Sequence, residues 1–242
     1  MLELYHNLAS TCSQKVRLCL AEKQLDYVSH EISLADFENL SAEYLSINPH
    51  GVVPTLIHDG ETILESSVIC EYLDEIYPAP ALSPPSALGR ARMRAWMRYN
   101  EEVPTAAIRV SSFYKLWREE IRNIPEHKFE QLSQAMSVRR GLFTQLRQSE
   151  SQDDLVVRDS LDSLERMMER MEHVLEGQEW LAGDAITLAD LVQVPILVRL
   201  EDLSVTSLWE RRPSVARWYA AVQARPSFAA AFAAGARVGN DP

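Results

Sequence analysis

Cysteine is scarce in this 242-residue sequence, which has only Cys12, Cys19 and Cys70. An odd number of cysteines at these spacings gives neither a disulfide framework nor the paired Cys-x-x-Cys spacing of a metal site. We therefore expect no bound metal. Because free thiols persist in a reducing compartment, we also expect a cytoplasmic location.

Basic residues are scarce in the first third of the chain. Residues 1–78 hold 13 acidic and 3 basic residues, a net charge of 3 − 13 = −10, whereas residues 79–242 hold 22 and 21, a net charge of −1. The sequence also lacks a lysine- or arginine-rich run, so we expect no nucleic-acid partner. This uneven charge favours two separate units.

Long hydrophobic runs are also missing. The longest uncharged apolar stretches, such as residues 191–198 with Gln193 and Pro195, are far too short to span a bilayer. Glu3 stands where a signal peptide needs basic or apolar residues. We expect no membrane partner.

The first 78 residues show a mixed helix and strand pattern. Apolar runs at 2–5 and 25–32 predict two parallel strands around a helix at 11–23. After a polar stretch at 41–47, Asp59-Gly60 separates two short apolar runs and predicts a hairpin. With a helical pattern at 66–77, the predicted order is β-α-β-α-β-β-α.

Prolines separate this unit from the rest of the chain. Pro78, Pro80, Pro84 and Pro85 predict a stiff linker at 79–86, between a domain at 1–78 and a domain at 87–242. The second domain shows only helical patterns, and Thr187 with Asp190 predicts a capping box. The helices are expected at 88–120, 128–148, 151–177, 188–200, 214–224 and 228–235. The fold class is therefore α/β followed by all-α.

A thiol lies at the predicted start of the first helix, in the run Ser10-Thr11-Cys12-Ser13. Thr11-x-x-Gln14 has capping-box spacing and predicts Thr11 as the N-cap. A helix N-terminus favours a thiolate, either that of Cys12 or that of a thiol bound beside it. The pattern indicates chemistry on sulfur. We expect Lys15 and Arg17 on a solvated face.

Three motifs together resemble the cytosolic glutathione transferases, and the first and third are nearest to the zeta class. They are STCSQKVRL at 10–18, NPHGVVPTL at 48–56 with Glu65-Ser66, and GDAITLAD at 183–190. The resemblance covers essentially the whole chain. It implies a thioredoxin-like N-terminal domain, glutathione as co-substrate and a homodimer.

The second motif also fits a bound peptide on physical grounds. A cis Val53-Pro54 bond would leave the Val53 backbone free to pair with a peptide. Ser66 could cap the helix whose N–H groups hold a carboxylate, and Glu65 could hold an ammonium, which together describe a γ-glutamyl group. The alternative is that Ser66 is only a cap and Pro54 only the start of a strand. His50 either contacts glutathione or is a turn residue.

The resemblance implies that Ser10 donates a hydrogen bond to the glutathione thiolate and that Cys12 lies near the substrate. The alternative for Cys12 is a small residue that fills space under the first turn. Cys19 and Cys70 lie among apolar neighbours, so we expect both in the core.

In the helical domain we expect Met93, Trp96, Met97 and Asn100 to line a substrate pocket that faces Ser10. A stripe at this spacing is also typical of a core. Phe113, Tyr114 and Trp117 continue the pattern. Residues 104–150, with breaks expected at Pro104 and Pro125, exceed the usual zeta-class length, which argues against zeta-type isomerase activity.

We therefore predict a transferase of the detoxification type, whose glutathione thiolate attacks a hydrophobic, aromatic or unsaturated electrophile. One alternative is a glutathione-dependent thiol reductase that uses Cys12, and another is a non-enzymatic binding module. For the expected homodimer, Arg90, Arg94 and Arg98 on one helical face could meet the acidic domain of the partner.

Overall fold

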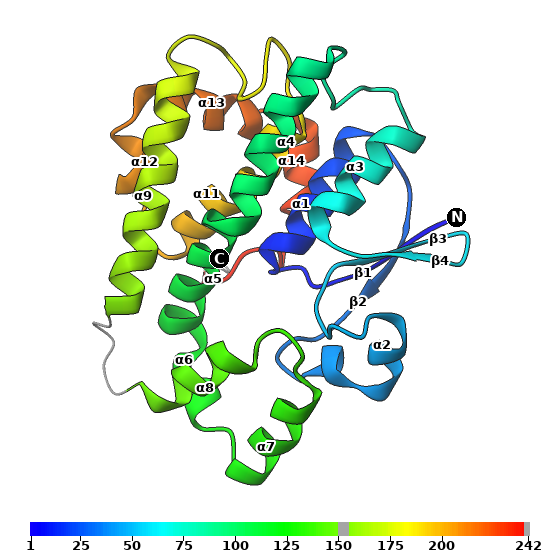
Figure 1. The fold of residues 1–242 in the computed structure, drawn as a ribbon, viewed down its shortest axis with the longest axis vertical. Helices are drawn as coiled ribbons and strands as arrows, with labels where there is room; N and C mark the ends of the chain where they lie inside the picture. Colours follow the sequence, from blue (N-terminus) through cyan, green and yellow to red (C-terminus); the bar gives the residue numbers. More distant parts are fainter. Residues whose placement is uncertain (150–154, 240–242) are drawn as a thin grey trace.

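The computed structural model describes residues 1–149 and 155–239, and its N-terminal part is a small mixed sheet with helices (Figure 1). The sheet has the order β2-β1-β3-β4, with β1 and β2 parallel and the other two pairs antiparallel. The elements are β1 (Leu2–His6), α1 (Thr11–Glu22), β2 (Val28–Glu31), η1 (Glu38–Leu40), α2 (Ala42–Ile47), β3 (Thr55–His58), β4 (Glu61–Ile63) and α3 (Ser66–Ile76). The thioredoxin-like order predicted from the sequence is confirmed.

The predicted hairpin is formed by β3 and β4. Asp59 has φ 50° and Gly60 has φ 89°, so both turn residues adopt left-handed backbone conformations. A two-residue turn with positive φ at both positions matches the twist of an antiparallel pair. The hairpin places β4 at the edge of the sheet, directly before α3.

Every described element after α3 is a helix. They are α4 (Ala87–Glu102), α5 (Pro104–Ser112), a π-helical turn η2 (Phe113–Trp117), α6 (Arg118–Arg122), α7 (Glu126–Ala135), α8 (Arg140–Gln148), α9 (Leu155–Leu175), α10 (Leu188–Leu191), α11 (Val194–Asp202), α12 (Ser207–Glu210), α13 (Pro213–Gln223) and α14 (Pro226–Ala231). The breaks predicted at Pro104 and Pro125 are confirmed. The continuous helix predicted at 88–120 is wrong, and residues 151–154 of the helix predicted at 151–177 lie outside the described residues.

Helix starts show where local motifs decide the structure and where they do not. Thr187 and Asp190 form the predicted capping box, in which the Thr187 N–H donates to Asp190 Oδ2 at 2.9 Å. At α1 the predicted N-cap Thr11 is wrong, because Ser10 Oγ accepts the hydrogen bond from the Ser13 N–H at 3.3 Å. At α3 the N-cap is Glu65, and Ser66 is the first helical residue rather than the cap.

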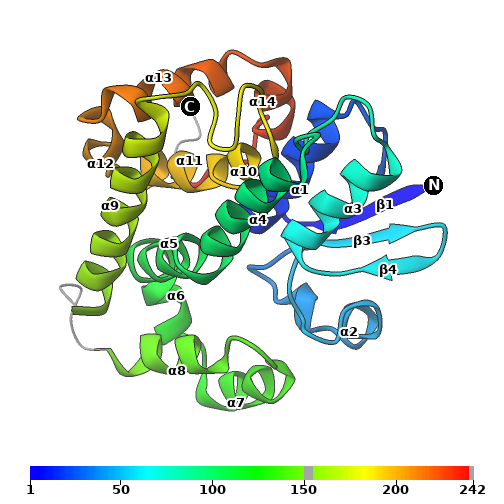
Figure 2. The same ribbon diagram turned by 45° about the horizontal axis from the view of Figure 1, so that its top comes forward.

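Helix α1 lies between the sheet and the helical domain, where it packs against α3, α10, α11 and α14 (Figures 1 and 2). Lys15 and Arg17 are buried, so the solvated face predicted for them is wrong. Lys15 Nζ donates to Thr105 Oγ1 at 2.9 Å and pairs with Glu101 Oε1 at 2.8 Å. Buried charges persist only when they are paired and hydrogen-bonded, and these bonds join the two domains.

Further polar contacts join the two ends of α1 to the last helices. Arg17 Nη2 donates to the Ala231 carbonyl at 3.0 Å, and Gln14 Nε2 donates to the Ala236 carbonyl at 2.7 Å. At the C-terminal end, Glu22 accepts two hydrogen bonds from Arg225, at 2.6 and 2.8 Å. The C-terminal segment therefore holds the helix that carries Ser10 and Cys12 at its start.

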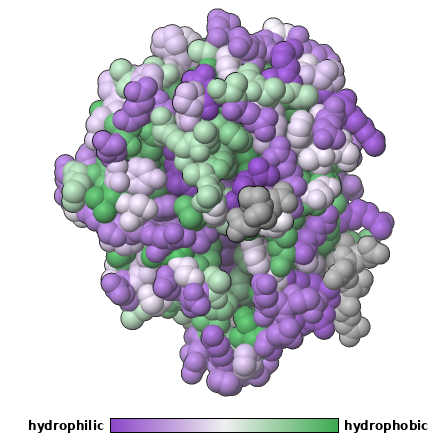
Figure 3. Space-filling model, turned by 180° about the vertical axis from the view of Figure 1, so that it is seen from behind, coloured by the Kyte–Doolittle hydropathy of each residue, from purple (hydrophilic) through white to green (hydrophobic). Residues whose placement is uncertain are grey.

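The outer surface mixes polar and apolar residues over short distances on the face that Figure 3 shows. Within residues 1–149 and 155–239, no helix has the length and apolar character needed to cross a bilayer.

His6 gives the fold a pH dependence that can be measured. Burial and the nearby charge of Arg17 lower its pKa to about 4, below the value of about 6.5 in an unfolded chain. The unfolded chain therefore takes up this proton first. The stability contributed by neutral His6 is complete above pH 6.5 and is lost as the pH falls towards 4, with a slope of up to about 1.4 kcal/mol per pH unit.

Urea unfolding at a series of pH values should therefore show a shallower decline between pH 6.5 and 4 in His6→Asn than in the wild type. His127→Asn, on an exposed face of α7, should keep the wild-type slope. An identical slope in all three proteins would contradict this role for His6.

Candidate active site

A cavity of about 700 Å³ lies where the N-terminus of α1 faces the helical domain. Ser10 and Cys12 line it together with His50 and Val53, so four predicted site residues meet in one place. The opposite wall comes from α5, η2, α6 and the segment that joins α7 to α8. The cavity can therefore bring a bound thiol beside Ser10 together with a second molecule.

Ser10 and Cys12 are both partly exposed to the cavity at the start of α1. Ser10 Oγ accepts its bond from the Ser13 N–H, which leaves the hydroxyl proton able to donate to a ligand. The first turn of a helix also presents unpaired N–H groups and a positive dipole end. Both features stabilise an anion such as a thiolate.

The loop before β3 presents a free backbone edge at Val53. Tyr44 Oη and Asn48 Nδ2 both donate to the Val52 carbonyl, at 2.7 and 2.8 Å, and so fix the loop. The Val53-Pro54 bond is cis, as predicted. Across residues 1–149 and 155–239 no protein group bonds the Val53 N–H or carbonyl. Val53 can therefore pair with an extended peptide, although Pro54 itself does not line the cavity.

Glu65 and Ser66 lie outside the cavity wall, at the start of α3. Glu65 is exposed and has φ 67°, a left-handed backbone conformation that is unfavourable for a glutamate. Such strain persists where the surrounding structure holds it and is typical of functional sites. Glu65 lies close enough to the cavity that its charge raises the pKa of Arg139, a cavity residue.

His50 lies at an exposed edge of the same cavity. Its N–H donates to Asn48 Oδ1 at 3.0 Å, and its carbonyl accepts a hydrogen bond from Ser137 Oγ at 3.1 Å. The backbone of His50 thus joins the sheet domain to the α7–α8 segment. Its imidazole is left for contacts at the edge of the cavity.

Four aromatic residues form the apolar side of the cavity, which we call the aromatic wall: Phe37, Phe113, Trp117 and Phe143. The ring of Phe113 lies 5.2 Å from that of Trp117 and 5.4 Å from that of Phe143. Phe37 reaches Phe143 from the sheet domain at 6.5 Å. The wall is continuous with a second hydrophobic cluster that supports α6 to α8. Its buried members are Tyr114, Ile121, Phe129, Met136, Phe143, Leu146 and Val157.

The pocket residues predicted on α4 do not line this cavity. Met93, Trp96, Met97 and Asn100 are between 0 and 5% exposed and belong to the interior. Asn100 Nδ2, for example, donates to the Val192 carbonyl at 3.0 Å and to Gln193 Oε1 at 2.8 Å. The prediction is wrong because the stripe packs against α10, whereas the chain beyond Pro104 forms the cavity.

Sequence reasoning missed the cationic cavity residues Arg109 and Arg139. Burial lowers the pKa of Arg139 to about 10, as does the nearby charge of Arg109, whereas Cys12 and Glu65 act in the opposite direction. Arg139 therefore lies near Cys12, which marks the predicted position of the sulfur, and near Glu65, which marks the predicted γ-glutamyl end. No local motif marks either arginine, because tertiary packing brings α5 and the α7–α8 segment to the same cavity.

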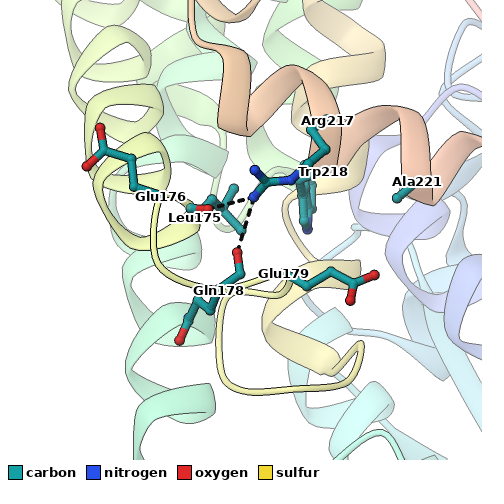
Figure 4. Close-up of a pocket in the computed structure, with 7 residues that line it drawn as sticks. All are labelled: Leu175, Glu176, Gln178, Glu179, Arg217, Trp218 and Ala221. Carbon is teal, nitrogen blue, oxygen red and sulfur yellow. Dashed lines mark hydrogen bonds between the residues drawn. The ribbon is translucent and has the colours of Figure 1, made fainter.

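A smaller cavity of about 400 Å³ lies between the end of α9 and α13 (Figure 4). Arg217 Nη2 donates there to the carbonyls of Leu175 and Gln178, at 2.6 and 3.2 Å. These bonds hold the turn that follows α9. This cavity contains none of the predicted site residues.

Comparisons with known proteins agree with this arrangement. Family models described as "Glutathione S-transferase, N-terminal domain" and "Glutathione S-transferase, C-terminal domain" match residues 4–81 and 136–226. Maleylacetoacetate isomerase of Pseudomonas aeruginosa is 31% identical over 89% of each chain. Glutathione S-transferase TCHQD of Arabidopsis thaliana is 26% identical over 94% of this chain and 88% of its own.

Among solved structures, the crystal structure of the beta-etherase LigF from Sphingobium sp. superposes with a TM-score of 0.87. It is 25% identical to this chain, and the match covers 96% of this chain and 98% of that one. Because about ten residues of this chain are left out, the match includes most of residues 113–148, which supply three of the four residues of the aromatic wall.

The aromatic wall should contribute measurably to stability. Phe143→Ala removes a ring that is 8% exposed and joins two aromatic neighbours, so the free energy of unfolding should fall by about 3 kcal/mol. Leu155→Ala, at a position 68% exposed, should change it by less than about 0.5 kcal/mol. Urea unfolding checks both values, and equal effects would show that the wall is not packed as described.

Proposed function

The chain belongs to the glutathione S-transferase family, near the zeta class and with glutathione as co-substrate, and we propose that its glutathione thiolate attacks an aromatic electrophile. The observation that carries the proposal is the cavity itself. It joins the Ser10 end of α1 to the aromatic wall, so a thiol and an aromatic ring can meet there. The three free thiols support a cytoplasmic location.

The proposed glutathione site extends from Val53 to α3. The free Val53 backbone pairs with the cysteinyl part of the tripeptide, and Glu65 takes the ammonium of the γ-glutamyl group. The N–H groups at the start of α3, together with the Ser66 hydroxyl, take the neighbouring carboxylate. His50 takes the glycine end. The unbonded Val53 edge and the strained backbone of Glu65 support this placement.

On the central cysteinyl residue of the tripeptide, the sulfur lies beside Ser10. The Ser10 hydroxyl donates to the thiolate, and a charge-assisted bond of this kind lowers the pKa of the thiol. The dipole of α1 acts in the same direction. Most of the rate enhancement then comes from holding a reactive thiolate against the electrophile.

The aromatic wall favours an aromatic second substrate. The similarity to a beta-etherase supports an aryl ether, with halogenated aromatics and unsaturated acids as further electrophiles. In ether cleavage the thiolate attacks the carbon that bears the ether oxygen. The C–S bond forms as the C–O bond breaks, and the aryl oxide leaves and takes up a proton from water. This substitution needs no oxidant or reductant.

Two variants distinguish this chemistry from thiol reduction by Cys12. Ser10→Ala should lower kcat/KM for conjugation about 10- to 100-fold, because a hydrogen bond to a charged group is worth about 1.5–3 kcal/mol. With glutathione at saturating concentration, the apparent pKa in the pH profile of kcat/KM for the electrophile should also rise. Cys12→Ser should keep most of the activity. Steady-state kinetics with an aryl ether and an aryl halide measure these effects.

The opposite pattern would favour the alternative enzyme. Loss of activity in Cys12→Ser, with a mixed disulfide as the preferred substrate and an active Ser10→Ala, would identify a glutathione-dependent thiol reductase. Failure to bind glutathione in a calorimetric titration would instead favour a non-enzymatic module.

We also propose a homodimer, although not all three of the arginines predicted to contact the partner are available for that contact. Arg94 Nε bonds Glu71 Oε2 at 2.8 Å, and Arg90 Nη1 bonds the Pro85 carbonyl at 2.7 Å, so both already have partners within the chain. The bond between Arg94 and Glu71 connects α4 to α3. Exposed apolar residues on these two helices support an interface there. Val68 on α3 is 52% exposed, and Leu88 on α4 is 64% exposed.

Light scattering should then give twice the chain mass of 27.5 kDa. Leu88→Asp should shift the protein towards the monomer by placing a charge in the interface, whereas Leu155→Asp should leave the mass unchanged. A monomeric wild-type protein would remove the proposal.

A further inference from the structure

Two arginines from the helical domain line the cavity without a partner. Arg109 lies on α5, and Arg139 directly precedes α8. In the described part of the chain, neither guanidinium takes part in an ion pair or a hydrogen bond. Arg199, which lines the same cavity, differs because it pairs with Asp202 at 3.3 Å.

The two guanidinium groups are close enough to repel each other. The charge of Arg109, together with burial, disfavours the charged form of Arg139, yet the pKa of Arg139 remains at about 10. Both groups are therefore cationic at neutral pH. A pair of like charges on a partly buried wall is unfavourable unless an anion binds between them.

Other charged residues only partly compensate the positive charge of Arg109 and Arg139. Glu120 and Lys128 are exposed and also line the cavity, and the Lys128 ammonium lies 5.9 Å from the centre of the Phe37 ring. The carboxylate of Glu65 attracts Arg139 from the sheet domain. In the proposed function, however, Glu65 is neutralised by the ammonium of glutathione. Among the described side chains of the protein itself that line the cavity, Arg109, Arg139 and Lys128 then face the single carboxylate of Glu120.

The position of Arg109 indicates which ligand the two guanidinium groups bind. Arg109 precedes Phe113 of the aromatic wall by one helical turn and lines the cavity from α5. A guanidinium group binds a carboxylate through two parallel hydrogen bonds, which also orient it. We propose that Arg109 and Arg139 bind a carboxylate on the aromatic electrophile and so select anionic aromatic substrates. This inference rests on the proposed function and narrows its substrate class.

A matched pair of electrophiles tests the inference. The first is a chlorodinitrobenzoate with the chloride para to the carboxylate, and the second is the corresponding benzamide, which is neutral and similar in shape. In both, the thiolate adds to the ring carbon, the C–S bond forms, the C–Cl bond breaks and chloride leaves. Rates are divided by the uncatalysed rate with glutathione, so that intrinsic reactivity cancels.

The wild type should prefer the benzoate. Arg109→Gln and Arg139→Gln should each lower kcat/KM for the benzoate at least about 10-fold, the effect of losing one hydrogen bond to a charged group. The benzamide value should change less than about 3-fold. Arg140→Gln is the matched control, since Arg140 is the exposed neighbour of Arg139 and its side chain donates to the Ser133 carbonyl. It should leave both substrates unaffected.

The outcomes separate this inference from the proposed function. Equal losses with both electrophiles, together with a higher KM for glutathione, would show that the pair binds glutathione and would overturn the inference alone. Unchanged kinetics in both arginine variants would also overturn it. If the wild type conjugates neither electrophile nor an aryl ether, the proposed function falls and the inference falls with it.

Discussion

The burial of helix α1 between two domains is the constraint on which the rest of the structure depends. Nine of its twelve residues are buried, and they include Lys15 and Arg17. Each buried charge is satisfied across the domain boundary, by Glu101 and Thr105 or by the Ala231 carbonyl. Removing one partner of such a pair leaves an unpaired buried charge, which is strongly destabilising. The helix is therefore fixed in position, and with it the first turn that carries Ser10 and Cys12.

This constraint explains why the cavity belongs to both domains. The sheet domain supplies a helix N-terminus and an unbonded backbone edge at Val53, which suit a thiol-bearing peptide. The helical domain supplies three of the four residues of the aromatic wall and two unpaired guanidinium groups, which suit an aromatic anion. Contacts such as Ser137 Oγ to the His50 carbonyl close the gap between them. The proposed chemistry needs both ligands at once, and only the packed arrangement places them together.

The features predicted correctly from the sequence are those that a few neighbouring residues determine. Asp59-Gly60 is sufficient for the hairpin, and Thr187 with Asp190 is sufficient for a capping box. The first helix shows the limit of such motifs, because Ser10 and Thr11 both have a capping hydroxyl and Ser10 makes the bond. The apolar stripe that includes Met93 and Trp96, predicted to line a pocket, is buried in the core. Helical periodicity shows only that one face of a helix is apolar, and it does not show whether that face meets a core or a pocket. Arg109 and Arg139 were beyond prediction, since long-range packing brings them together.

The central claim is that the start of α1 stabilises the thiolate of bound glutathione. Ultraviolet absorbance of the thiolate, titrated with pH in a Cys12→Ser background, reports on that sulfur without interference from the thiol at the same site. With glutathione at saturating concentration, the account predicts an apparent pKa at least about one unit below the value of about 8.5 for a free thiol. An apparent pKa equal to that of free glutathione would contradict it.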